Sequence, residues 1–401
     1  MKMMLNDMIA QFRRPRGIAL LLVVVMIAVM LPIVTDMNYE ARTEFELAMN
    51  YKKKAEAQAL AQSGLAFAAI VFDLQKQIEG LLKSSTLQSL GIQSFEIWDI
   101  IPFDTSMLRA FTAAGPFADI GDITGSGSSD GTGTTGEGIS AGDQGVVQPV
   151  DEGDPLFEFP GDFKLEFENE DTKININLLD SGAKEGVARM LWGIVEPQLY
   201  DFLFLENTAR REFVTREELI ANIADWIDGD DERYLIGGDE RSLYDEFIPK
   251  YGVKNARFDT INELRMVYGV DDVVFRLLAP NITIYSSGRI NVSKAPPIIL
   301  EALIRSYAKD KNSGMFYSED MMREFMGKVL SRRARDGFNK AEDFVAAVRE
   351  EGVELDPAVS SQLTAEGSFY RIRVYGERDG VEALIEMVVD KNFNIYFYRE
   401  G

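Results

Sequence analysis

The chain concentrates carboxylates in one short, glycine-containing stretch, DWIDGDDERYLIGGDER. From position 228 onward its acidic residues are Asp228, Asp230, Asp231, Glu232, Asp239 and Glu240, countered by Arg233 and Arg241. Carboxylates this close repel one another unless solvent or a bound cation relieves the repulsion. Calcium is the natural hard-cation partner, because it takes about six to eight oxygen ligands and readily uses carboxylates.

The same stretch has two other interpretations, which the residues leave open. It can be a solvated acidic loop without an ion, or it can supply the acid and base of a hydrolase. Hydrolases of that kind hold two carboxyl groups about 5–9 Å apart in a cleft, and a consecutive Asp-Asp-Glu run in a loop is a poor frame for this. The loop is not an EF-hand, since the required Gly and Glu do not fall correctly from Asp228.

Histidine and cysteine are absent from all 401 residues. This excludes a Ser-His-Asp triad, a cysteine nucleophile, a disulfide and the usual zinc sites, so only carboxylates, Lys, Tyr and hydroxyl groups remain for chemistry. The net charge of −23 argues against a nucleic-acid partner, because such affinity comes mostly from Lys and Arg on phosphates. The length predicts two to three domains. The lack of cysteine fits either a reducing or an oxidising compartment.

The amino terminus joins a basic stretch to an uncharged one. Three arginines within residues 13–16 precede Gly17, and residues 18–34 read IALLLVVVMIAVMLPIV. This run is marginal for crossing roughly 30 Å of hydrocarbon, although its flanks extend it. Because the basic flank comes first, we expect a single span with a cytoplasmic amino end and an exported bulk.

Three interpretations of this amino terminus compete. A secretory signal peptide requires a small-residue cleavage site after the apolar run, whereas LPIVTDMNYEA is bulky and charged. An ordinary membrane anchor is the second. The third rests on Arg16-Gly17-Ile18, since a basic leader ending in Gly before an apolar helix resembles a type IV prepilin leader. That resemblance implies that a prepilin peptidase cuts after Gly17 and methylates the new amino terminus at Ile18.

The apolar run continues into a second helical pattern. Residues 38–82 contain no Pro, and only Gly64 and Gly80 interrupt a composition of good helix formers. Apolar residues recur at helical spacing, as an amphipathic helix requires: Phe45, Ala48, Ala55, Ala61, Leu65, Ala68 and Phe72. A coiled-coil stalk would show cleaner heptads. An apolar helix that runs unbroken into an amphipathic one is typical of pilins.

Downstream patterns predict a sheet and helices. Residues 119–154 are rich in Gly, Ser, Thr and Asp without Lys or Arg, which predicts a flexible insertion. Residues 157–179 alternate apolar and polar, which predicts a strand pair with a turn near 169–171. Helices are expected over 183–204 and over 216–227, the second opened by a capping box at Thr215.

The carboxyl-terminal half predicts more helices and then a meander. Residues 258–278 are expected to form a helix, a glycine-containing turn and a second helix, followed by a short strand over 282–290 and a helix opening within 291–304. Three period-two runs separated by ERDG and DKN then predict antiparallel strands over 366–401.

These segments together resemble one family, the minor pseudopilin K family of type II secretion systems. The amino-terminal helix and the phrases KININLL, DWIDGDDE, FDTINEL and INVSKAPPIILEAL resemble its landmarks in order, and cover most of the chain outside the Gly-rich insertion. Pilin-like proteins generally carry Glu at the fifth mature position, which is Leu22 here. The K family resembles this chain in lacking that Glu.

The resemblance implies a protein without catalytic activity, and it also implies a site, partners and a location. K pseudopilins bind calcium in the acidic region, and the candidate ligands here are Asp228, Asp230, Asp231, Asp239 and Glu240. The family's Gly-Ala-Glu reads Gly-Gly-Asp at 237–239, so either Asp239 or Glu240 takes that ligand's place. Expected partners are other minor pseudopilins at the pseudopilus tip, prepilin peptidase and the inner-membrane secretion platform. The expected location is the bacterial inner membrane, with the bulk periplasmic.

A rival function is a membrane-anchored DNA-uptake receptor built on helix-hairpin-helix modules. Such modules present glycine-rich hairpins and nearby Lys or Arg to phosphates. The candidate turn, VYGVDD at 267–272, has one Gly and two acids, which repel phosphate. The hairpins are better read as helix-packing units inside an inserted domain.

The predicted fold is therefore α+β, with a pilin-like amino-terminal helix on an antiparallel sheet and a large inserted helical domain of SAM-like or helix-hairpin type. The expected segments are a leader (1–17), the long helix (18–82), a flexible insertion (119–154), first strands (156–180), an inserted helical domain with the acidic loop (181–285), a second helical part (286–365) and carboxyl-terminal strands (366–401).

Overall fold

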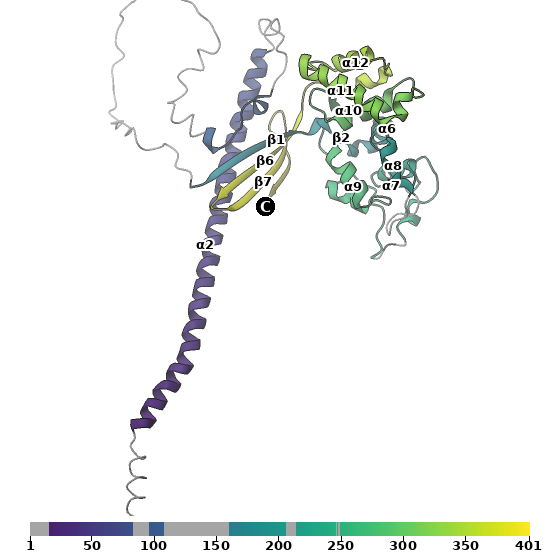
Figure 1. The fold of residues 1–401 in the computed structure, drawn as a ribbon. Coiled ribbons are helices and arrows are strands. Elements are labelled where there is room, and N and C mark those ends of the chain that lie inside the picture. The colour runs from purple at the N-terminus through teal and green to yellow at the C-terminus, as the bar shows by residue number, and fades with distance from the viewer. Residues whose placement is uncertain (1–15, 83–95, 108–159, 206–213, 246, 248) are drawn as a thin grey trace, which may run out of the picture.

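The computed structural model describes residues 16–82, 96–107, 160–205, 214–245, 247 and 249–401. The expected flexible insertion at 119–154 and most of the expected leader lie outside the described residues. The described chain forms a long helix, a four-stranded sheet against its second half, and a helical domain beside the sheet (Figure 1).

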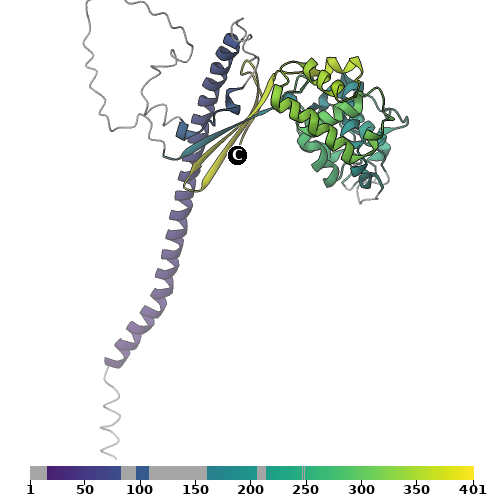
Figure 2. The same ribbon diagram turned by 45° about the horizontal axis from the view of Figure 1, so that its top comes forward.

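Helix α2 runs without interruption from Arg16 to Leu82, as the sequence predicted. Its first half carries exposed apolar side chains and extends beyond the sheet as a rod (Figures 1 and 2). The helix segment Ala19–Gly80 contains a window long and apolar enough to cross a membrane. Pro32 removes one backbone donor from this stretch, yet the helix continues through it.

The second half of α2 packs closely on the sheet because small residues face it. Ala57, Ala61 and Ala68 are fully buried. A Cβ on Gly376 would lie 2.1 Å from the carbonyl oxygen of Ala57, and one on Gly64 would lie 2.6 Å from Val374 Cγ1. The helix axis therefore lies nearer the strands than larger residues permit.

The sheet is antiparallel throughout, in the order β1-β6-β7-β8. Its strands are β1 (Asp162–Asn169), β6 (Phe369–Arg378), β7 (Val381–Asp390) and β8 (Ile395–Glu400). The last three form the predicted carboxyl-terminal meander. Alternate residues of the central strands, such as Ile372 and Met387, are buried in the core shared with α2.

The predicted strand pair within 157–179 is wrong in its second half. β1 pairs with the distant β6, while β2 (Ile174–Asn175) pairs in parallel with β3 (Ile282–Thr283). Between them the short 3-10 turn Glu170–Thr172 redirects the chain instead of closing a hairpin. Its acidic side chains are buried against partners more than a hundred residues away, which local alternation cannot reveal.

The helical domain is inserted between the neighbouring strands β1 and β6, as predicted. Its helices are α6 (Lys184–Val195), α7 (Phe202–Leu205), α8 (Arg216–Asp225), α9 (Asp272–Leu278), α10 (Pro297–Tyr307), α11 (Glu319–Asp336) and α12 (Ala341–Glu350). A further short parallel pair joins β4 (Ile290–Asn291) to β5 (Leu363–Thr364).

Prolines and short turns account for the helix boundaries that differ from prediction. Pro197 separates α6 from α7, where one helix over 183–204 was expected. Residues 261–266, expected to be α-helical, form a 3-10 helix. The helix expected from 291 onward begins at Pro297, because Pro fits the first helical turn and disfavours a helical residue before it.

A buried polar network joins the sheet to the helical domain where the chain crosses between them. Glu170 is completely buried and accepts hydrogen bonds from Arg371 Nε (2.5 Å), Lys173 Nζ (3.4 Å) and Thr283 Oγ1. Its neighbour Asp171 accepts from the backbone N–H groups of Ser287, Ser368 and Phe369. Two adjacent carboxylates therefore stabilise both places where the chain passes between the sheet and the helical domain, after β1 and before β6.

Candidate metal centre

Helix α8 delivers the first carboxylate of the site. The predicted capping box is present: Thr215 Oγ1 accepts from Glu218 N, and the Glu218 carboxylate accepts from Thr215 N. The helix ends when the N–H groups of Ile227 and Asp228 both turn back to the carbonyl of Ala224. Asp225, its last residue, is 3% exposed.

The loop after α8 brings a second carboxylate back to the first. Arg233 and the Gly237–Gly238 pair exchange backbone hydrogen bonds of 3.0 Å, which close a tight turn. Both glycines have positive φ, a conformation that other residues adopt only with strain. The turn returns the chain to Glu240, which starts a 3-10 helix and is 1% exposed.

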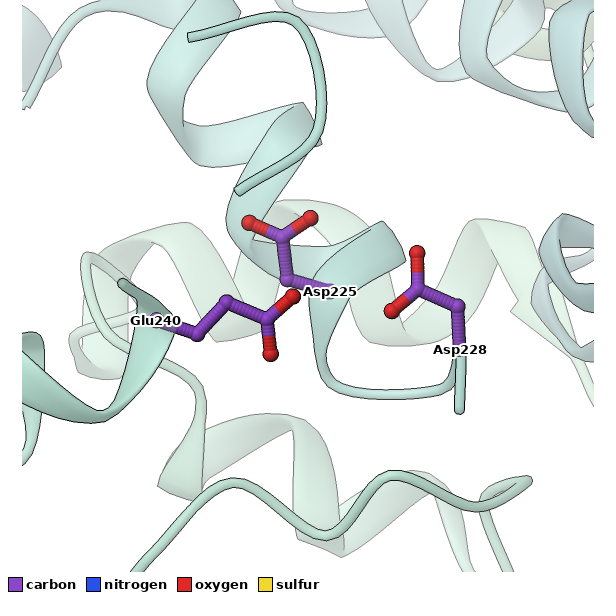
Figure 3. Close-up of side chains that lie close together, drawn as sticks. All are labelled: Asp225, Asp228 and Glu240. Atoms are coloured by element: carbon purple, nitrogen blue, oxygen red, sulfur yellow. The ribbon is translucent and has the colours of Figure 1, made fainter. Parts of the chain in front are cut away.

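The side chains of Asp225, Asp228 and Glu240 lie close together, and one oxygen from each lies within 4.8 Å of the others (Figure 3). Asp225 Oδ1 accepts from Tyr234 N at 2.8 Å, and Asp228 Oδ2 from Lys184 Nζ at 2.8 Å. Four buried oxygens have no donor among the described residues: Asp225 Oδ2, Asp228 Oδ1 and both Oε of Glu240.

The burial and mutual proximity of these carboxylates raise the pKa values of two of them. Burial, together with the negative charges of the nearby Asp225 and Asp228, raises the pKa of Glu240 to about 8. Burial likewise raises the pKa of Asp225 to about 7, against the opposing hydrogen bond from Tyr234 N–H. Unless a positive charge is added, the cluster favours protonated carboxyl groups near neutral pH.

These residues fit a hard divalent cation. A buried carboxylate oxygen without a donor is costly, and these three side chains carry four of them, while the ammonium group of Lys184 pairs with Asp228. Carboxylate oxygens are the ligands that calcium and magnesium prefer, and all three residues of this cluster offer carboxylate oxygens rather than nitrogen or sulfur. The described site therefore provides oxygen ligands for such an ion, and the ion would supply the positive charge that the site lacks.

The structure brings together two of the five residues named from sequence, Asp228 and Glu240. The other three have local roles. Asp230 Oδ1 accepts from Glu232 N, Asp239 Oδ1 accepts from Arg241 N, and Asp231 forms a two-point ion pair with Arg241 at 2.5 and 3.1 Å. Of the alternatives Asp239 and Glu240, the structure places Glu240 in the cluster.

Sequence reasoning missed Asp225, which belongs to a helix and not to the loop. The available signal was its position among apolar residues that are all buried, such as Ile223 and Trp226. A charged side chain in such surroundings is rare unless it is paired or binds a metal.

The helix-hairpin turn at 267–272 offers little to a phosphate. The side chain of Asp271 accepts from Val273 N and Val274 N, the N–H groups that an anion at the start of α9 would use. This agrees with the sequence reading of these hairpins as packing units.

Gly17 and Ile18 lie in the first turn of α2, where the described chain begins. Their position directly before the exposed apolar half of the helix is the one that the prepilin reading requires. The cleavage and methylation themselves stay predictions.

An apolar helix running into an amphipathic one, with an antiparallel sheet on its second half, defines the pilin-like class of α+β proteins. Residues 172–287 of this chain match the family model described as type II secretion system (T2SS), protein K. The predicted resemblance to the K family is thereby confirmed, and the matched segment holds the whole carboxylate cluster.

Two individual proteins are similar to this chain. Type II secretion system protein K of Pectobacterium carotovorum subsp. carotovorum is 28% identical over 131 residues, which is 32% of this chain and 39% of that protein. A chain in the crystal structure of the GspK-GspI-GspJ complex from enterotoxigenic Escherichia coli aligns with a TM-score of 0.45 and 16% identity, over 60% of this chain and 80% of that one.

Proposed function

We propose that this chain is a minor pseudopilin of a type II secretion system, without catalytic activity. The observation that carries the proposal is the combination of an unbroken pilin-type helix, Arg16–Leu82, with a domain that matches the protein K family model. The single candidate span in the described chain supports anchoring in the inner membrane, and the arginines before Gly17 support a cytoplasmic amino end.

We further propose that it caps the pseudopilus and supports export of folded proteins together with other minor pseudopilins. In pilin-like fibres a Glu at the fifth mature position neutralises the amino-terminal charge of the subunit ahead, and an unpaired charge in the membrane costs about 2.5–3.5 kcal/mol. Leu22 cannot supply that neutralisation, so this subunit fits where nothing precedes it. The inserted helical domain adds bulk beside the sheet, which obstructs stacking in a shaft (Figure 2).

Replacing Gly17 with phenylalanine is expected to keep residues 1–17 attached and to stop assembly, because the peptidase requires the small residue before the cut. The mass of the chain isolated from membranes measures this directly: the wild type loses 1–17 and gains one methyl group. The same preparations, labelled on the helical domain, locate the wild-type chain at fibre tips. Normal processing of the Gly17 variant, or label along the whole shaft, contradicts the proposal.

We propose that calcium is the ion for the carboxylate cluster and that its role is structural. The cluster joins the end of α8 to the segment that follows the loop, so an ion there links two parts of the helical domain. The supporting observations are the buried oxygens without donors and the all-carboxylate donor set. Calcium suits it better than magnesium, which holds its waters tightly and demands stricter geometry.

Removing calcium is expected to lower the melting temperature of the full chain by several degrees. A ligand at about one hundred times its dissociation constant adds about 2.7 kcal/mol to folding stability. Calorimetry with calcium, with magnesium and with chelator measures the effect, and Glu240→Gln serves as the variant that no longer responds. Asp239→Asn is the matched control, since Asp239 lies in the same loop outside the cluster. Identical melting curves in calcium and chelator contradict the proposal.

A further inference from the structure

A cavity of about 370 Å³ lies between the pilin-like part and the helical domain. The end of α2 and residues 96–100 form one side, and residues 291–294 with the end of α11 form the other. Residues 365–367, where the chain returns from the helical domain to the sheet, form a third part of the wall. Its size lies within the range of small-ligand sites, and it is separate from the carboxylate cluster.

Arg333, in the last turn of α11, is the unusual residue of this cavity. It is only partly exposed, and its Nη1 donates to the carbonyls of Ala295 (2.6 Å) and Val292 (3.5 Å). Within the described part of the chain, its Nε and Nη2 have no acceptor, and no carboxylate forms an ion pair with it. The neighbouring arginines of the helix differ, because Arg332 pairs with Glu350 and Arg335 with Asp336.

The electrostatic surroundings agree with this geometry. Burial lowers the pKa of Arg333, and no anion offsets the effect. An unpaired, partly buried guanidinium is an unfavourable arrangement unless an anion completes it. The two donors left open, Nε–H and Nη2–H, form the side-on pair that matches both oxygens of a carboxylate.

The two other cations in the cavity wall have carboxylate partners. Lys294 pairs with Glu96 and with Asp99, the latter at 2.5 Å, and Lys391 pairs with Glu366 at 3.0 Å. Glu79 forms no ion pair in the described chain; it accepts a hydrogen bond from the amide of Gln75 at 3.1 Å. The wall therefore holds three cations and four carboxylates, and Arg333 is the one cation among these described residues that has no carboxylate partner.

We propose that this cavity binds a ligand through a single carboxylate group held side-on by Arg333. Glu79 disfavours a ligand that brings a second negative charge. Two sources share the chemistry: a free small monocarboxylate, and the carboxyl terminus of a peptide. Because the cavity is lined by both the pilin-like part and the helical domain, its ligand contacts both.

The test is calorimetric titration of the full chain in detergent with four probes: N-acetylglycine, its neutral amide, the dicarboxylate malonate, and acetyl-triglycine. We expect N-acetylglycine to bind with a Kd of about 1 mM, and the amide and malonate to bind at least about tenfold more weakly. Tighter binding of acetyl-triglycine identifies a peptide terminus as the source, and equal binding identifies the free carboxylate.

Variants assign the interaction to Arg333. Arg333→Gln is expected to weaken N-acetylglycine about tenfold or more, while Arg335→Gln, on the exposed face of the same helix, leaves it unchanged. Arg333→Lys keeps the positive charge and a donor for the Ala295 carbonyl, so it should fold normally. It loses the paired Nε–H and Nη2–H donors, so it should bind N-acetylglycine several-fold more weakly. Equal binding by wild type and Arg333→Lys, or no binding of any carboxylate probe, overturns the proposal.

Discussion

Replacing Glu170 with alanine is expected to lower the free energy of unfolding by about 3 kcal/mol, because removing one partner of a buried ion pair leaves the other uncompensated. Glu170 is completely buried, and its loss takes a carboxylate from Arg371, Lys173 and Thr283 at once. Arg371 keeps Glu386 at 3.0 Å, and Lys173 keeps Glu168 at 2.6 Å. The effect therefore falls at the lower end of the range for broken buried pairs.

Urea unfolding of the full chain measures this change through the transition midpoint at constant slope. Glu354→Ala is the matched control: it also removes one carboxylate from an ion pair, with Lys309, but both side chains there are largely exposed. Because exposed ion pairs contribute little to stability, its unfolding midpoint is expected to stay close to that of the wild type. Glu170→Gln, which keeps the shape and one acceptor, should fall between the two. Equal midpoints for Glu170→Ala and Glu354→Ala contradict this account of the junction.

The elements that the sequence predicted well are those whose signal is local. The long helix follows from an uncharged run joined to a helical repeat, and the meander follows from three period-two runs with turn residues between them. The strand pair failed for the opposite reason. Whether Leu165 pairs with a neighbour in sequence or with Val374, more than two hundred residues away, is decided by where the inserted domain returns the chain.

The metal cluster shows the same limit at the level of single side chains. Composition located the acidic stretch but could not separate carboxylates that cap backbone N–H groups, such as Asp230, from those that converge on one point. Convergence depends on the turn at Gly237–Gly238, which returns Glu240 to the end of α8. Asp225 enters the site from the helix, so a search confined to the loop did not include it.

The second large effect concerns pH. In metal-free buffer the full chain should lose stability as the pH rises from 5 to 8. The pKa of Glu240 is raised from 4.5 to about 8 and that of Asp225 from 3.8 to about 7, so the folded state holds protons that the unfolded state has released. Their stabilising contribution is complete below the unfolded values and is lost as the pH passes through the folded ones.

The size of this effect follows from the same linkage. Each unit by which a folded pKa exceeds its unfolded value corresponds to about 1.36 kcal/mol, so the two groups together should lower the free energy of unfolding by at least about 2 kcal/mol across this window. Carboxylates whose pKa is lowered by cations, such as Glu386 and Glu168, act oppositely and only at more acidic pH. The interval from 5 to 8 therefore isolates the cluster.

Saturating calcium should reverse the trend, because the ion binds the deprotonated carboxylates and replaces the missing positive charge. Melting temperatures at pH 5, 6, 7 and 8, after calcium is removed on a chelating resin and again after it is restored, measure both slopes. Glu240→Gln removes the largest titration and should flatten the metal-free slope, whereas Asp239→Asn should retain it. A metal-free chain that is as stable at pH 8 as at pH 5 would show that the three carboxylates do not share a buried, uncompensated site.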